Sequence, residues 1–181
     1  GLLGMHDAKL KLTGLPRLDL PRAQHLARRG RLRLDANNLW HNAIDALPPL
    51  TALAQHAWAI EEPIAPRDWE GLRRIHRDTG LAIILDESFT RLHDLQAAPA
   101  DMAIVPNLRV SKLGGLMRSL ECLRHATGPV IVGAQVGETS VLARAGLVLA
   151  QAAGNRLCGY EGAYGRLLLR HDVVRPCIGF G

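Results

Sequence analysis

Charged side chains recur at regular intervals along the chain, each close to the end of a short apolar run. Successive members of this set lie 23 to 29 residues apart: Lys11, Asp35, Glu61, Asp86, Arg109, Glu138 and Glu161. Carboxylates and amines that meet at one end of a set of parallel strands can bind a cation and move a proton. The spacing therefore predicts a site assembled from the ends of several strands.

Three of these groups are carboxylates from consecutive repeats, Asp35, Glu61 and Asp86. Carboxylates at close range repel one another unless a cation lies among them. A set of oxygen donors suits a hard ion, so we expect Mg²⁺, with Mn²⁺ as a substitute. Each acid taken alone is also compatible with a solvated loop, but three in step with the strand period favour a metal site. Asn37, two residues after Asp35, is expected to orient a ligand or to bind substrate.

Lysine is rare in this chain, which has 22 Lys and Arg residues but only three lysines, Lys9, Lys11 and Lys112. Unlike arginine, lysine can lose its proton when it is buried or placed near another cation. Lys9 and Lys11 share one face of a strand because side chains alternate with a period of two. Lys11 is nearer the strand end and is the predicted general base. The alternative is a solvated pair on an edge strand.

The elements that position these groups alternate along the chain. Apolar runs predict strands, and apolar residues spaced three and four apart predict helices between them. The expected strands are Ala8–Thr13, Leu32–Asp35, Ala57–Glu61, Ala82–Asp86, Leu108–Ser111, Val130–Gly133 and Leu157–Tyr160. The expected helices are Pro21–Arg29, Asn42–His56, Asp68–Thr79, Phe89–Ala97, Leu113–Ala126 and Thr139–Ala153, with Asp68 as an N-cap.

This alternation predicts an α/β fold with parallel strands. An open sheet gathers its site at one switch point, whereas a barrel gathers groups from the ends of many strands. The even distribution of charges favours a (β/α) TIM-type barrel with about seven units. No GxGxxG or GxxxxGK[ST] motif supports a dinucleotide or P-loop site.

Five short motifs, taken in order, resemble a known family. Lys-x-Lys, Asp-Ala-Asn, Glu-Glu-Pro, Asp-Glu-Ser and Lys-x-Gly-Gly occur in the stretches 9–11, 35–37, 61–63, 86–88 and 112–115. Their order is similar to that in the barrel domain of the mandelate racemase and muconate cycloisomerase branch of the enolase superfamily, over about residues 8 to 175. The resemblance implies that Asp35, Glu61 and Asp86 bind Mg²⁺, which grips the substrate carboxylate and stabilises an enolate. It also implies that Lys11 removes the neighbouring proton, with Lys9 in support.

Two positions depart from the family pattern. Arg109 stands where muconate cycloisomerases and dipeptide epimerases often have the first lysine of Asn-x-Lys-x-x-Lys-x-Gly-Gly, and Lys112 matches the second. Arginine stays protonated, so Arg109 is expected to hold a substrate carboxylate or act as an electrostatic clamp. Near the end, Glu161 replaces an Asp-x-Asp motif and is expected to meet a cationic substrate group. Glu138 lies where the family has an acid near the second catalytic position.

Composition excludes several classes of protein. With 48% hydrophobic residues the chain can form a core, and no apolar stretch approaches the ~18 residues of a membrane span. The net charge of +5 is scattered, and the few aromatic residues argue against nucleic-acid binding. Three cysteines without a CxxC pair, and no leader, predict a cytoplasmic protein. We expect a small carboxylate as substrate and a homo-oligomeric parent.

Length limits the expected domain. A complete barrel takes about 250 residues, whereas this chain has 181. We expect residues 1–181 to be a single barrel domain that is truncated on its N-terminal side and lacks the family's capping domain, with truncation at the C-terminal end left open. The predicted activity is that of an isomerase or lyase: a racemase or epimerase, a cycloisomerase or a dehydratase. The alternative is an inactive barrel fragment with a metal-binding, structural or oligomerisation role.

Overall fold

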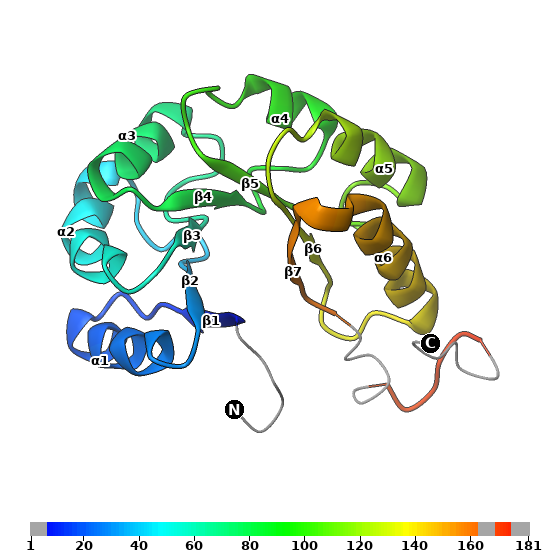
Figure 1. Ribbon diagram of the computed structural model, residues 1–181, viewed down its shortest axis with the longest axis horizontal. Coiled ribbons are helices and arrows are strands. Elements are labelled where there is room, and N and C mark those ends of the chain that lie inside the picture. The colour runs from blue at the N-terminus through cyan, green and yellow to red at the C-terminus, as the bar shows by residue number, and fades with distance from the viewer. Residues whose placement is uncertain (1–6, 163–168, 175–181) are drawn as a thin grey trace. The chain divides into compact units, whose positions relative to one another are not determined.

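The computed structural model describes residues 7–162 and 169–174, where strands and helices alternate (Figure 1). The strands are β1 (Asp7–Lys11), β2 (Arg31–Asp35), β3 (Ala59–Glu61), β4 (Ala82–Leu85), β5 (Ile104–Arg109), β6 (Val130–Gly133) and β7 (Leu157–Tyr160). The helices are α1 (Pro16–Ala27), α2 (Ala43–Ala54), α3 (Trp69–Thr79), α4 (Leu92–Ala97), α5 (Leu116–His125) and α6 (Ser140–Ala153), with a 3₁₀ turn at Gly154–Arg156. Among the described residues, no helix has the length and apolar character that crossing a membrane requires.

The strands follow one another in the sheet in chain order, β1 to β7. This order, with a helix after each strand from β1 to β6, is that of a TIM-type (β/α) barrel and differs from the reversed order of a doubly wound sheet. The predicted fold class is therefore confirmed. By its internal contacts the chain forms two compact units, residues 1–88 with 96–105 and residues 89–95 with 106–181. That residues 1–181 form a single domain stays a prediction.

The first unit contains β1 to β4, and the pairs β1–β2, β2–β3 and β3–β4 are parallel. Helices α1, α2 and α3 lie on one side of these strands (Figure 1). The register places Lys11 beside Asp35 and Asp35 beside Glu61. Glu61 pairs with Ile84, so Asp86 lies two residues further along the next strand. The register thus brings charged residues of neighbouring strands to the same level at the carboxyl ends.

Side chains alternate across β2 in a way that separates core from site. Leu32 and Leu34 are buried, as are Leu50 of α2 and Leu72 of α3. Because successive residues of a strand point to opposite faces, Arg33 and Asp35 point to the other face. A strand that is apolar on one face and charged on the other holds its charged groups rigidly against a packed layer.

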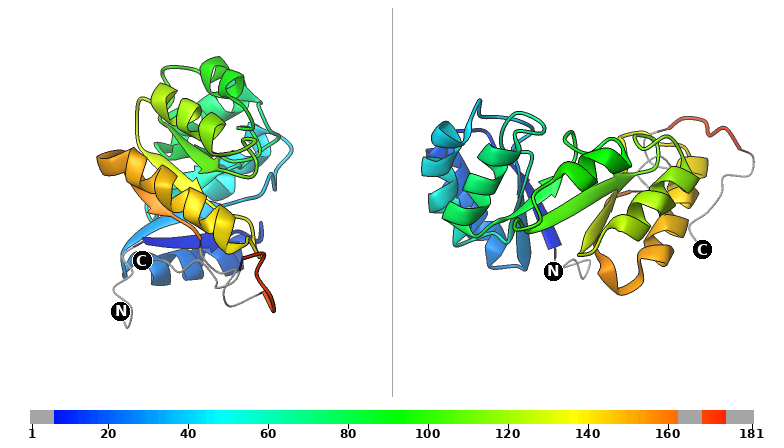
Figure 2. Two further views of the ribbon diagram at one scale, coloured as in Figure 1. Left: turned by 90° about the vertical axis from the view of Figure 1, so that its right-hand side faces the viewer. Right: turned by 90° about the horizontal axis from the view of Figure 1, so that it is seen from above.

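The second unit contains β6, β7 and most of β5, with α5 and α6. Asn107 pairs with Ile131 and Arg109 with Gly133, both in parallel. Helices α5 and α6 pack side by side (Figures 1 and 2). All four residues of β6 are buried, which is typical of a strand covered on both faces.

Local signals explain several helix ends. The Asp68 side chain accepts a hydrogen bond from the Gly71 N–H, which confirms the predicted N-cap. Asn42 caps α2 by accepting from the Asp45 N–H. Gly80 follows α3 with φ of 74°, a left-handed conformation that glycine adopts without strain.

Several boundaries differ from the sequence prediction, and three of them illustrate why. Helix α1 begins at Pro16 and not at Pro21, since a proline in the first turn lacks an N–H that would be unpaired there. Strand β5 begins at Ile104, so the expected strand at Leu108–Ser111 overlaps it by two residues only. Helix α4 begins at Leu92, three residues after the expected start. The loop before α4 is held by Asp94, which accepts from the Thr90 and Arg91 N–H groups.

Candidate active site

Two buried carboxylates converge on one ammonium group at the carboxyl ends of β2 and β3. The Lys9 Nζ lies 3.3 Å from Asp35 Oδ2 and 3.4 Å from Glu61 Oε2. The carboxylate side chains are 7% and 2% exposed, whereas that of Lys9 is 29% exposed. The structure thus brings the two acids and Lys9 together.

Asn37 determines how Asp35 presents its oxygens. Its backbone N–H and its side-chain Nδ2 both donate to Asp35 Oδ1, at 3.2 and 2.6 Å. The backbone of Asn37 has φ of 46°, in the left-handed region that asparagine tolerates better than most residues. One oxygen of Asp35 is thus engaged by the loop, and the other faces Lys9. The predicted orienting role of Asn37 agrees with this contact, and its substrate contact stays a prediction.

Asp86 is buried immediately after β4, with 3% exposure. Within the described residues, no three His, Cys, Asp or Glu side chains are grouped closely enough to hold a metal ion. The role of Asp86 as the third carboxylate of a metal site therefore stays a prediction.

Glu62 fixes the loop that carries Asp86. Its Oε1 accepts from the Asp86 and Ser88 N–H groups at 2.6 and 2.7 Å, and its Oε2 accepts from the Ser88 hydroxyl at 2.7 Å. Burial raises the pKa of the Glu62 carboxyl to about 7, although these hydrogen bonds act to lower it. Glu62 has φ of 41° and is fully buried. The Glu62 side chain therefore stabilises the tight turn after β3 in which Glu62 lies.

Lys11 differs from Lys9 in its surroundings although both are on the same strand. Lys11 is exposed at the end of β1, beside Asp35 in register. Lys9 thus lies between two carboxylates, whereas Lys11 lies at the end of the strand.

The second unit holds the other predicted groups, Arg109, Lys112 and Glu138. Arg109 ends β5 beside Gly133, where an added Cβ would lie 3.1 Å from Arg109 Cγ. Lys112 donates to the Asn107 carbonyl at 3.4 Å, and its ammonium lies 5.9 Å from the centroid of the Phe89 ring. Glu138 accepts from the Gln135 N–H at 2.9 Å and from the Ser111 hydroxyl at 3.1 Å. Lys112 and Glu138 thus have contacts that order loops.

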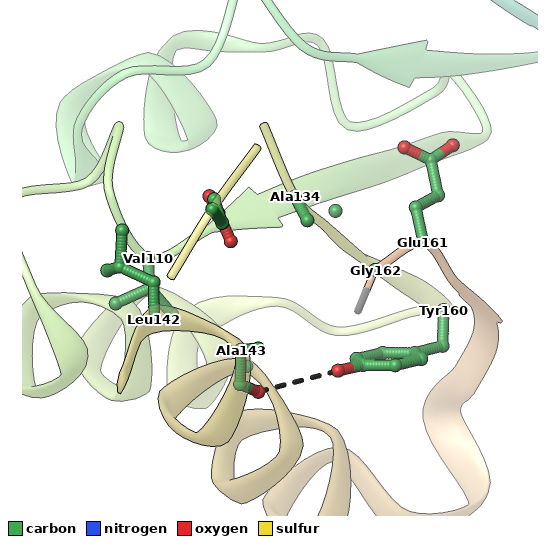
Figure 3. Close-up of a pocket in the computed structure, with 10 residues that line it drawn as sticks. Val110, Ala134, Leu142, Ala143, Tyr160, Glu161 and Gly162 are labelled. Carbon is green, nitrogen blue, oxygen red and sulfur yellow. Dashed lines mark hydrogen bonds between the residues drawn. The ribbon is translucent and has the colours of Figure 1, made fainter. Parts of the chain in front are cut away.

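A small pocket lies between the ends of β6 and β7 and the first half of α6, lined in part by Ala134, Glu138, Gly146, Tyr160 and Glu161 (Figure 3). The Tyr160 hydroxyl donates to the Ala143 carbonyl at 3.5 Å, and Glu161 turns away from the Tyr160 ring. Burial raises the pKa of the Tyr160 hydroxyl, and the charge of Glu138 adds to this effect. Glu161 borders this pocket, and half of the lining residues are Gly or Ala.

Two buried acids that order strand-end loops were absent from the sequence-based set. Asp19 accepts from the Thr13 and Gly14 N–H groups at 3.0 to 3.1 Å and from the Thr13 hydroxyl at 2.9 Å. Asp94 binds the loop after β4 in a similar way, including the Thr90 hydroxyl at 3.0 Å. The signal common to both is a threonine in the loop followed four to six residues later by an aspartate in the first turn of the helix.

Comparison with known proteins decides the family. The model of the family described as "Enolase C-terminal domain-like" matches residues 3–178. The chain belongs to this family. The predicted resemblance is therefore confirmed, and the site above lies in an enolase C-terminal-like domain.

Among its relatives are enzymes of several activities. The chain is 30% identical over 175 residues to a chloromuconate cycloisomerase of Cupriavidus pinatubonensis, covering 91% of this chain and 46% of that enzyme. It is 35% identical over 130 residues to an o-succinylbenzoate synthase of Thermobifida fusca, covering 70% of this chain and 39% of that enzyme. The chain thus spans less than half the length of these curated relatives.

Solved structures extend the likeness to the fold. A dipeptide epimerase from Cytophaga hutchinsonii, complexed with Mg and the dipeptide D-Ala-L-Val, has a TM-score of 0.76 and 26% sequence identity. The match covers 93% of this chain and 47% of that one. The enolase C-terminal-like domain described here therefore shares its fold with a metal-containing epimerase.

Proposed function

We propose that this enolase C-terminal-like domain belongs to an enzyme that removes the proton α to the carboxylate of a small substrate. The observation that carries the proposal is the convergence of the Asp35 and Glu61 carboxylates on one cation, 3.3 and 3.4 Å from Lys9 Nζ, with Lys11 one pleat further along. Relatives named as cycloisomerase, synthase and epimerase support an isomerase or lyase activity.

The residues fit a divalent cation by their chemistry. Asp35 and Glu61 are buried acids that already face one positive charge, and Asp86 is buried at the end of the next strand. Hard divalent cations prefer carboxylate oxygens. We propose these three residues as ligands of Mg²⁺, or of Mn²⁺ in its place. When bound, the ion would supply positive charge next to the substrate carboxylate as negative charge builds up there.

Lys11 is proposed as the general base. A base must reach the substrate carbon and must lose its proton near neutral pH. Lys11 is exposed at the strand end and pairs in register with Asp35, so it lies next to the proposed carboxylate position. Lys9, two residues back on the same face of β1, is proposed to support it.

Arg109 is proposed to bind a second anionic group of the substrate. A guanidinium stays charged and can donate two parallel hydrogen bonds to a carboxylate. Such a group orients the substrate but takes no proton, which favours reactions with one base, such as cycloisomerisation or elimination of water. Asn37 and Glu161 are proposed to contact other polar substrate groups, and Lys112 and Glu138 to support the second catalytic position.

Proton exchange tests the proposal. The protein is incubated in D₂O with Mg²⁺ and a panel of acid sugars, N-acyl amino acids and dipeptides, and deuterium uptake at the α-carbon is followed by NMR. We expect uptake with at least one carboxylate, lost on addition of EDTA and in Asp35→Asn. Arg28→Gln, a change at an exposed residue that ends helix α1 and is therefore remote from the carboxyl ends of the strands, serves as the control. Absence of exchange across the panel with Mg²⁺ retained would favour an inactive metal-binding or structural fragment.

A further inference from the structure

Lys9 stands where a bound cation would be expected. Its ammonium lies between Oδ2 of Asp35 and Oε2 of Glu61, and both distances exceed the ~2.8 Å of a tight charged hydrogen bond. One ammonium is thus shared by two acceptors. These carboxylates are almost fully buried, so without a cation between them their repulsion would be poorly screened.

The single positive charge of Lys9 lies between the negative charges of Asp35 and Glu61. Two carboxylates carry two negative charges and one ammonium carries a single positive charge. A dication would balance the pair, and its attraction to each oxygen at equal distance is twice that of the ammonium. The Lys9 ammonium and a divalent ion cannot both contact this pair of oxygens, because the repulsion between the two cations would be large.

Lys9 has room to leave. Its side chain is 29% exposed, while those of its two partners are buried. Lysine has a flexible stem of four carbons, so its ammonium can move to water without any change in the strand. Asp35 keeps its orientation in either case, because Asn37 holds its other oxygen from the loop.

We propose that Lys9 is a built-in cation that keeps Asp35 and Glu61 together in the metal-free protein and that is displaced by the incoming divalent ion. This inference rests on the metal site of the proposed function. It predicts that removal of the Lys9 charge destabilises the metal-free protein and increases the affinity for the metal ion. A lysine that only supports the metal site would give the opposite change in affinity.

The test compares Lys9→Met with Lys11→Met. Both variants lose one ammonium from the same face of β1, but Lys11 lies at the strand end, two residues beyond the lysine that contacts Asp35 and Glu61. Thermal unfolding is measured in EDTA and in Mn²⁺, and the Mn²⁺ affinity is measured from the EPR signal of free Mn²⁺. In EDTA we expect Lys9→Met to lower Tm by about 5–10 °C and Lys11→Met to lower it by less than about 2 °C.

Affinity decides the proposal. We expect Lys9→Met to bind Mn²⁺ at least about tenfold more tightly than the wild type, Lys11→Met to bind within about threefold of it, and Mn²⁺ to restore the Tm of Lys9→Met. If the wild type binds Mn²⁺ and Lys9→Met binds it no more tightly, this inference is overturned and the metal site of the proposed function is not. No Mn²⁺ binding by any of the three proteins would overturn the metal site of the proposed function as well. If Lys9→Met folds only with Mn²⁺, that dependence supports the proposal, and if it folds in neither condition, Lys9→Gln is compared for affinity in its place.

Discussion

Gly133 is the residue whose replacement gives the sharpest structural test. A Cβ at Gly133 would lie 2.2 Å from Oδ1 and 3.0 Å from Cγ of Asn107, and 3.1 Å from Cγ of Arg109. Asn107 is fully buried, so its amide has no solvent into which it can move. Ordinary contact requires ~3.5 Å, so Gly133→Ala must displace the Asn107 amide by about 1 Å.

The cost follows from this overlap. Overpacking a close-packed interior typically costs about 1–3 kcal/mol. For a chain of this size that corresponds to a fall in Tm of about 2–12 °C. The same shift moves the stem of Arg109, so any substrate contact made by Arg109 should weaken in this variant too.

Gly146 provides the matched control within the same unit. It lies inside α6, and an added Cβ would meet its nearest neighbours, in Tyr160 and Val132, at 3.7 to 3.9 Å. Alanine at that position has no overlap and removes the entropic cost of a helical glycine, a gain of about 0.5–1 kcal/mol. Thermal and urea unfolding of both variants measure the difference. A Tm of Gly133→Ala within 1 °C of wild type, or an equal loss in Gly146→Ala, would refute the reasoning.

Three further predictions concern the strand-end loops and the proposed reaction. Asp19→Ala leaves the Thr13 and Gly14 N–H groups without their acceptor, so urea unfolding should show a loss of about 2–4 kcal/mol; a loss below 0.5 kcal/mol would contradict the role of Asp19. Lys11→Met should slow α-proton exchange by about 10²–10⁴-fold with Mn²⁺ affinity within about threefold, and unchanged exchange would exclude Lys11 as the base. Arg109→Met should raise KM by about 10–100-fold with a smaller change in kcat, as steady-state kinetics will show; a fall in kcat alone would contradict a binding role.

The sequence was sufficient to predict the fold class because one signal repeated many times. Apolar runs followed by a charged residue at steady intervals predict parallel strands with their polar ends at one edge, and the register of Lys11, Asp35 and Glu61 agrees. Single boundaries were harder. Pro106 and Asn107 are poor strand formers, so the start of β5 was missed although both residues are buried in it.

The sequence could not predict which side chains contact one another. Nothing in the order of residues shows that Lys9, and not Lys11, lies between two carboxylates, because both have the same strand parity. That difference depends on the depth of each residue along β1 and is visible only in the distances. The buried acids Asp19 and Asp94 were missed for a similar reason, since their carboxylates accept hydrogen bonds from backbone groups of loops.

The position of a bound Mn²⁺ ion tests the central claim most directly. Crystals of the protein grown with Mn²⁺ would be measured near the manganese absorption edge to locate the ion by anomalous scattering. The account predicts one peak about 2.2 Å from carboxylate oxygens of Asp35, Glu61 and Asp86, with Lys9 Nζ withdrawn from its present partners. A fully occupied ion elsewhere, or one bound with Asp86 turned away, would contradict the proposed site.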